Sequence, residues 1–299
     1  MVIRFIPDKT NYKFVNKRQI CIVLSIIVLL GTAFSLYYKG LNFGIDFSGG
    51  IILEIRTEKP IDLAKLRNDL GKGVYLQSLG TDASSLLIRV APDKNINQSE
   101  QTKIVKDHII KATGGKVEFR KTDYVGAQVG DELITNALLA LVLSFIAMFT
   151  YLWFRFEWQY GLGALLALVH DAAAVIGFYS VTGIEFDLTS VAAILTVIGY
   201  SINDSVVIYD RMRENVRKYK KMPLADLIDL SVNETLSRTI MTVGTTILAL
   251  VSLSIFGGDV IRGFSLGMLF GVVVGTYSSI YVSAILLIYL DPRKAEHNK

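Results

Sequence analysis

The sequence predicts a polytopic α-helical membrane protein, with six transmembrane helices and one α+β, ferredoxin-like domain between the first two. Hydrophobic residues make up 52% of the 299 residues and charged residues only 19%, whereas a soluble domain carries about 25% charged residues. The deficit in charge is concentrated in six long apolar stretches, and a membrane-spanning helix needs about 20 such residues. Residues 39–131, between the first two stretches, have instead the composition of a soluble domain.

The boundaries of the spans follow from these apolar stretches. We assign the transmembrane helices to residues 20–38, 132–154, 158–184, 188–209, 238–256 and 263–290. The remaining parts are an N-terminal segment, the folded domain, a loop and a C-terminal tail, at residues 1–19, 39–131, 210–237 and 291–299. The last span is longer than a hydrocarbon layer of about 30 Å requires, so it must tilt or project.

The first span and the basic residues decide how the chain is inserted. A secretory signal has an apolar core of about 7–15 residues; the apolar run at 20–38 is longer, which favours a retained span. With the N-terminus inside, sixteen Lys and Arg fall in the inner segments, against Arg262 alone in the short outer loops. Positive charge accumulates on the cytoplasmic side. We therefore expect both termini to be cytoplasmic and the domain at 39–131 to be extracytoplasmic.

The extracytoplasmic domain shows alternating strand and helix patterns. We expect strands at 51–56, 74–79, 86–90 and 116–125, with helices at 61–70 and 98–112. The order β-α-β-β-α-β is the split arrangement of ferredoxin-like domains. This arrangement serves many purposes, so it does not by itself assign a function.

Composition also excludes several classes of chemistry. One cysteine, Cys21, and three scattered histidines cannot build a zinc cluster or a haem-attachment motif. The net charge of +4 comes from basic loop ends, which gives no reason to expect nucleic-acid binding. The glycine-rich segment at 44–50 lacks the Lys-Ser/Thr end of a phosphate loop and leads into a strand. We expect neither a cofactor nor an enzyme.

Two carboxylates fall well inside apolar spans, Asp171 in the third and Asp204 in the fourth. A charged side chain at the bilayer centre costs about 2.5–3.5 kcal/mol on insertion scales, so such residues are functional candidates. On helical spacing, Tyr200 and Ser201 share a face with Asp204, and Asn203 lies beside them.

Further polar groups accompany the two acids. Arg238 and Thr242 share a face of the fifth span, and His170 precedes Asp171. Such groups suit a hydrated proton path. The alternatives are that Arg238 is only a positive-inside anchor, that Asp204 is a neutral structural residue, and that the His170 imidazole simply bonds a neighbour.

Three blocks resemble one known family closely. They are GIDFSGG after the first span, HDAAAVIGFYSVTGIEFDLTSVAAILTVIGYSINDSVVIYDRMREN across the third and fourth, and NETLSRTIMTVGTTILALVSLSIFGG entering the fifth. They are similar to the signature blocks of SecF proteins of the SecD/SecF family, which assist the bacterial Sec export machinery. The resemblance covers essentially the whole chain.

The resemblance implies half of a transporter of the resistance–nodulation–division superfamily, paired with SecD as a heterodimer. It implies that the proton motive force drives late stages of protein export, with Asp204 and Arg238 in proton transport. The implied partners are SecD, the SecYEG channel, the SecA motor, YajC, exported unfolded polypeptides and the lipid bilayer.

Two other classes of function remain open from the residues. A proton-coupled exporter of small molecules or lipids could use the same architecture. Such an exporter would need a large domain to carry its substrate, and the single extracytoplasmic domain of this chain is small. An intramembrane hydrolase using His170 and Asp171 would need both side chains to converge, and neighbours on a helix point about 100° apart. No serine nucleophile motif accompanies them.

Overall fold

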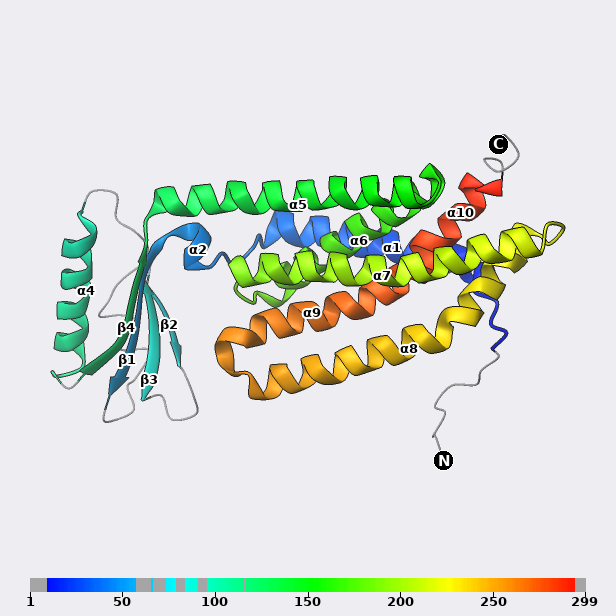
Figure 1. The fold of residues 1–299 in the computed structure, drawn as a ribbon. Coiled ribbons are helices and arrows are strands. Elements are labelled where there is room, and N and C mark those ends of the chain that lie inside the picture. Colours follow the sequence, from blue (N-terminus) through cyan, green and yellow to red (C-terminus); the bar gives the residue numbers. More distant parts are fainter. Residues whose placement is uncertain are drawn as a thin grey trace, which may run out of the picture. The chain divides into compact units, whose positions relative to one another are not determined.

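Six helices are long and apolar enough to cross a membrane, as the sequence predicts. The computed structural model describes residues 10–57, 66, 74–78, 84–90, 96–115 and 117–293. The helices that contain the spans are α1 (Arg18–Tyr38), α5 (Ala127–Arg155), α6 (Trp158–Thr182), α7 (Leu188–Lys218), α8 (Leu224–Phe256) and α9 (Gly258–Ser278), the last of which continues through the π-helical η2 (Ser279–Ala284) into α10 (Ile285–Leu290) (Figure 1).

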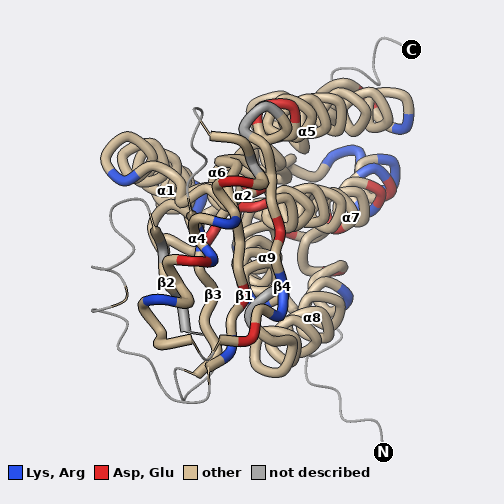
Figure 2. Tube along the Cα trace, turned by 90° about the vertical axis from the view of Figure 1, so that its left-hand side faces the viewer, with Lys and Arg blue, Asp and Glu red and all other residues tan. Residues whose placement is uncertain are grey.

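The chain divides into two units. Residues 1–42 and 139–299 form the helical unit, and residues 43–138 form the second, which holds the sheet. Charge is sparse along the helices and gathers near their ends (Figure 2). This distribution is what a membrane-embedded bundle requires, because charge is costly in hydrocarbon.

The helical unit has an inner and an outer layer of spans. In the most apolar stretches of α6, α7 and the last span, 61%, 50% and 56% of residues are buried, against 6%, 6% and 11% in α1, α5 and α8. Helix α9 packs on α6, α7 and α8, while α1 packs on α6. The inner layer therefore consists of α6, α7 and the last span, and the polar groups on their buried faces lie in the protein interior.

Small residues bring the inner helices close together. A Cβ at Gly271 would lie 2.3 Å from Val197 Cγ2, and one at Gly267 would lie 2.1 Å from the Tyr179 hydroxyl. One turn further along α9, a Cβ at Gly275 would lie 3.2 Å from Ser201 Cβ. These glycines recur every four residues, the spacing that lets membrane helices approach with few intervening atoms.

The segment at 210–237, expected as a loop, is helical in the structure apart from residues 219–223. Helices α7 and α8 continue through it and bond to each other. Arg211 Nε donates to Glu234 Oε2 at 2.7 Å, and Asn215 Nδ2 donates to the same carboxylate at 2.7 Å and to Ser231 Oγ at 3.1 Å. A hydropathy pattern does not predict such polar contacts between two neighbouring helices.

The N-terminal segment is tied to this helical extension. The backbone N–H of Tyr12 donates to Asn233 Oδ1 at 2.9 Å, and Asn233 Nδ2 donates to the Tyr12 carbonyl at 2.8 Å. Asp229 accepts the backbone N–H of Val15 at 2.9 Å. The start of α1 is thus fixed to α8 through side chains that satisfy its free backbone groups.

The second unit contains the expected sheet. Strands β1 (Gly50–Thr57), β2 (Val74–Ser78), β3 (Ser85–Val90) and β4 (Val117–Val125) pair in the order β2-β3-β1-β4. Every neighbouring pair is antiparallel, as in a ferredoxin-like domain. Helix α4 (Gln98–Ala112) joins the hydrophobic core through Val105 and Ile109. The expected helix at 61–70 lies outside the described residues, except for Leu66.

Two glycines govern the entry into this sheet. A short helix, α2 (Ile45–Ser48), ends at Gly49 with φ of 67°, and Gly50 follows with φ of 129°. L-residues rarely adopt such values, whereas glycine adopts them without a steric penalty. The two glycines therefore turn the chain from α2 into β1.

We predict that Gly271→Ala destabilises the helical unit by about 1–3 kcal/mol, because the added methyl overpacks the contact with Val197. A matched control is Gly199→Ala on α7, where a Cβ meets no atom within 4 Å. The thermal unfolding midpoints of the two purified variants should separate, with only Gly271→Ala falling below the parent. Equal midpoints would show that α9 can move away from Val197 without loss of stability.

Candidate functional site

Asp171 lies at the centre of a polar cluster inside the helical unit. Its side chain is 0% exposed and projects from the α6 face formed by Ala164, Ala167 and Ala174, which are also buried. The small-residue face expected from the sequence is thus where α6 meets its neighbours. A carboxyl group in this position must be satisfied by protein groups, since a buried polar group without partners is costly.

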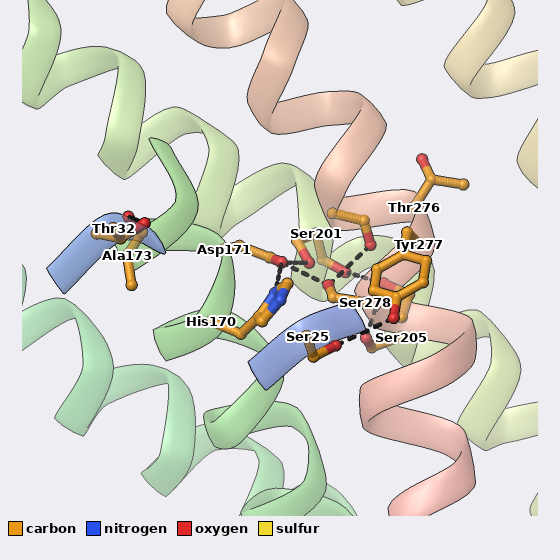
Figure 3. Close-up of polar contacts among 12 residues, drawn as sticks. Ser25, Thr32, His170, Asp171, Ala173, Ser201, Ser205, Thr276, Tyr277 and Ser278 are labelled. Carbon is orange, nitrogen blue, oxygen red and sulfur yellow. Dashed lines mark hydrogen bonds and ion pairs between the residues drawn. The ribbon is translucent and has the colours of Figure 1, made fainter. Parts of the chain in front are cut away.

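Two serine hydroxyls donate hydrogen bonds to this carboxyl group. Ser201 Oγ of α7 donates to Asp171 Oδ2 at 2.6 Å, and Ser278 Oγ at the end of α9 donates to the same oxygen at 2.7 Å (Figure 3). The other oxygen, Oδ1, lies 3.2 Å from His170 Nδ1. The neighbouring side chains of His170 and Asp171 therefore meet, despite their expected angular separation along the helix. One carboxyl group joins three inner helices.

The outer helix α1 closes one side of this cluster. Tyr277 donates its hydroxyl to the Cys21 carbonyl at 2.6 Å and contacts the Ser25 hydroxyl at 3.1 Å (Figure 3). The ring of His170 lies 6.2 Å from that of Tyr277, and His170 is 4% exposed. Its Nε2 has no hydrogen-bond partner among the described residues. The imidazole retains one free nitrogen in a closed environment.

Asp204 has a different environment on the other side of α7. It is half-buried, and Thr239 Oγ1 of α8 donates to its Oδ1 at 2.6 Å. Its Oδ2 is buried and has no hydrogen-bond partner in the part of the chain that the structure describes. One oxygen of this carboxyl group is therefore available to a proton or to another group.

The remaining predicted residues lie around Asp204 and are less enclosed. Arg238 is exposed, and its guanidinium forms no ion pair with the Asp204 carboxylate; both side chains are described. Thr242 is exposed and donates to the Arg238 carbonyl of its own helix at 2.8 Å. Asn203 is exposed, whereas Tyr200 is half-buried and its hydroxyl has no partner among the described residues.

The structure thus separates side chains that helical spacing places on one face. Ser201 points to Asp171 on α6, and Asp204, three residues later, points to Thr239 on α8. His170 and Ser201 both contact Asp171. The side chains of Asp204 and Arg238 form no bond to each other. Helix α7 therefore carries two distinct polar sites on adjacent faces.

The chemistry of this arrangement is that of proton or hydrogen-bond exchange. Carboxyl, hydroxyl and imidazole groups can each gain or lose a proton or a hydrogen bond. Within the described residues, no group of three or more His, Cys, Asp or Glu side chains is placed to hold a metal ion.

Comparison with known proteins agrees with this architecture. Residues 105–293 match the family model described as protein export membrane protein SecD/SecF, C-terminal, and residues 34–61 match the SecD/SecF GG motif. The chain belongs to the SecD/SecF family. The GG motif match includes Gly49 and Gly50, which turn the chain into β1. This membership confirms the resemblance seen in the sequence.

Individual SecF and SecDF proteins extend the likeness over the whole chain. Protein translocase subunit SecF of Rickettsia rickettsii is 46% identical over 98% of this chain and 96% of its own length. SecF of Rickettsia bellii is 45% identical over 98% of each chain. The crystal structure of SecDF from Thermus thermophilus, a translocon-associated membrane protein, superposes with a TM-score of 0.82 at 32% identity. The match covers 96% of this chain and 40% of the SecDF chain.

Several side chains of the two candidate sites are not evident from the sequence. Ser278 and Thr239 each donate to one of the two carboxyl groups. The only sequence signal for Ser278 is the paired serine in the otherwise apolar run of the last span. Thr239 adjoins Arg238 and is buried, whereas Thr242 one turn later is exposed. Contacts over such sequence distances depend on which helix faces meet.

We predict that Ser201→Ala and Ser278→Ala each destabilise the helical unit by about 1–3 kcal/mol, since each leaves the buried carboxyl group one donor short. The double variant should deviate from the sum of the two, because both hydroxyls serve one oxygen. Chemical unfolding of the four proteins in mixed micelles measures this coupling. Strict additivity would show that the two serines act independently.

Proposed function

We propose that this chain is the SecF-type auxiliary subunit of a Sec protein translocase. Together with SecD, it uses the proton motive force to drive late stages of protein export across the bacterial inner membrane. The family membership and the SecF relatives support the role in export. The observation that carries the coupling to protons is Asp204, whose second carboxyl oxygen is buried and has no hydrogen-bond partner among the described residues.

The physical basis of the coupling is a carboxyl group that changes charge inside the membrane. A neutral carboxyl is cheap to bury, whereas a charged one needs a cation or water. Arg238 lies on the next helix and is not bonded to Asp204, so a small movement of α8 relative to α7 would bring a cation to the site or remove it. One proton crossing the membrane supplies about 2.3 kcal/mol per 100 mV, which is enough to shift a two-state equilibrium.

The proposed proton pathway combines the Asp171 site between α6, α7 and α9 with the Asp204 site between α7 and α8. Its residues are Asp204, Arg238, Asp171, Asn203, Ser201, Tyr200, His170 and Thr242. The energy source is the proton gradient, so the proposal requires no cofactor. The distribution of Lys and Arg supports cytoplasmic termini and an extracytoplasmic domain at 39–131.

The outer layer of the bundle supports a SecD partner. Asn203, Arg238 and Thr242 are exposed polar residues within or bordering apolar spans, and polar groups facing lipid are costly. SecD would cover them, and the fused SecDF chain is consistent with such an arrangement, because this chain matches only 40% of it. SecYEG, SecA, YajC and unfolded polypeptide are the further partners that this role implies.

We predict that Asp204→Asn abolishes the gradient-dependent part of export while leaving assembly and ATP-driven initiation intact, because the amide keeps the size but cannot cycle its charge. The assay is translocation into inverted vesicles at fixed ATP, with the gradient collapsed by an ionophore. Arg238→Ala should have the same effect, and the double variant should add little. Asp171→Asn tests whether the buried cluster contributes as well.

The matched control for Asp204→Asn is Asp210→Asn, since Asp210 lies on the same helix but is exposed and paired with Arg155 at 3.1 Å. The control should respond to the gradient as the parent does. If Asp204→Asn vesicles also respond like the parent, the proton path does not use Asp204.

We also predict a stable complex with SecD in the membrane. Native mass spectrometry of the co-expressed chains in several mild detergents should show a 1:1 species. Asn203→Leu together with Thr242→Leu should weaken this species, since both residues are exposed polar groups that the partner would cover. A monomer alone in every detergent would contradict the pairing.

A further inference from the structure

A ladder of buried hydroxyl groups leads away from Asp171 along the interface of α7 and the last span. On α7 its members are spaced by one turn, at Ser201, Ser205 and Tyr209. Ser205 Oγ donates to Ser279 Oγ at 3.1 Å, and the Tyr209 hydroxyl bonds to Ser283 Oγ. Together with the bonds at Asp171, these pairs make three successive rungs, which we call the hydroxyl ladder.

Each rung is closed off from the surroundings of the bundle. The exposed fraction is 1% or less for all six hydroxyl residues, Ser201, Ser205, Tyr209, Ser278, Ser279 and Ser283. Aromatic rings pack around the last rung, with Tyr160 at 4.9 Å and Phe156 at 5.9 Å from the Tyr209 ring. The ladder therefore lies in the interior of the helical unit.

Stability gives only a weak reason for such a ladder. Interhelical hydrogen bonds in membranes contribute about 0.6 kcal/mol on average, and a pair of apolar groups of the same shape can be as stable as a bonded polar pair. A sequence selected for packing alone could fill these positions with Ala, Val and Phe. Six hydroxyls in line from a buried carboxyl group require a further reason.

The backbone is modified along the same line. The last span is π-helical over η2, Ser279–Ala284, the segment that carries two of the ladder serines. Single π-helical turns inside α-helices occur often at functional sites. On the opposite side, a Cβ at Gly163 would lie 2.9 Å from the Tyr209 hydroxyl. A glycine there leaves room for that hydroxyl.

The ladder ends close to the surface of the bundle. Tyr209 is followed by Asp210, whose ion pair with Arg155 is exposed. The eight residues from Ser201 to Tyr209 correspond to about 12 Å along the helix. The ladder thus joins a fully buried carboxyl group to the end of the bundle at which α5 turns into α6, where Phe156 and Tyr160 pack on Tyr209, on a different face of α7 from the Asp204 site.

We propose that the hydroxyl ladder is a proton relay between Asp171 and that end of the bundle, acting in series with Asp204. The proposal rests on the proton-driven function above. Ser201 passes its hydroxyl proton to the Asp171 carboxylate and takes one from the direction of Ser205, so that each hydroxyl is restored and the carboxyl group gains one proton. A hydroxyl can do this because it both donates and accepts.

Transfer between rungs requires movement or a water. Successive rungs are four residues apart on α7, or about 6 Å along the helix, which is farther than one hydrogen bond but within reach through one bridging water. Rotation of the hydroxyls, or admission of a water at the π-helical turn, would connect them. The relay therefore conducts only in states that open η2 relative to α7, which would couple proton passage to helix movement.

The test uses the complex with SecD, reconstituted in vesicles that contain a pH-sensitive dye. Under an imposed gradient, Tyr209→Phe and Ser205→Ala should each reduce proton flux about tenfold or more, in line with the contribution of positioned proton-transfer groups. The matched control is Ser180→Ala. Ser180 is 1% exposed and bonds to Ser35 at 2.7 Å between α6 and α1, off the ladder. It should leave the flux unchanged.

The outcomes separate the relay from the proposed function. Similar shifts in unfolding midpoint for Ser205→Ala and Ser180→Ala, with flux lost only in the former, would support the relay. Normal flux in both Tyr209→Phe and Ser205→Ala, with flux lost in Asp204→Asn, would overturn the relay and leave the proposed function intact. Absence of gradient-driven flux in the unmodified complex would overturn both.

Discussion

The close approach of α9 to α6 and α7 is the constraint on which the interior of the helical unit depends. Glycines at 267, 271 and 275 allow α9 to lie where any larger side chain would meet Tyr179, Val197 or Ser201. This contact brings Ser278 within hydrogen-bond distance of Asp171. Without it, the carboxyl group would lose one of its two hydroxyl donors in a region that offers no solvent to replace it.

The two carboxyl groups illustrate how the surroundings of a side chain determine its use. Asp171 is fully buried and held by Ser201, Ser278 and His170, so a change in its protonation must rearrange three helices. Asp204 is half-buried and has one free oxygen, with Thr239 as its sole bonded partner among the described residues. The first is suited to coupling with helix packing, and the second to exchange with a group brought from outside.

The layering of the spans connects these sites to a partner. The inner helices α6, α7 and α9 carry the enclosed polar groups, whereas α1, α5 and α8 are mostly exposed in the single chain. Arg238 and Thr242 lie on the exposed side of α8 and form no hydrogen bond or ion pair with Asp204. A chain that leaves such groups uncovered in a membrane is incomplete by itself, which agrees with its place in a family whose members include the longer SecDF.

The sequence by itself determined the six spans, the strands and second helix of the ferredoxin-like domain, the two intramembrane carboxylates and the family. These features follow from local hydropathy, from alternation and from motif residues that lie close together in the chain. Only the tertiary structure decided that Ser278 and Thr239 complete the two sites, that Ser201 and Asp204 face different helices, and that α7 and α8 continue through residues 210–237. Each of these depends on side chains that are distant in sequence, such as Asp171 and Ser278, and meet only because small residues let particular helix faces pack together.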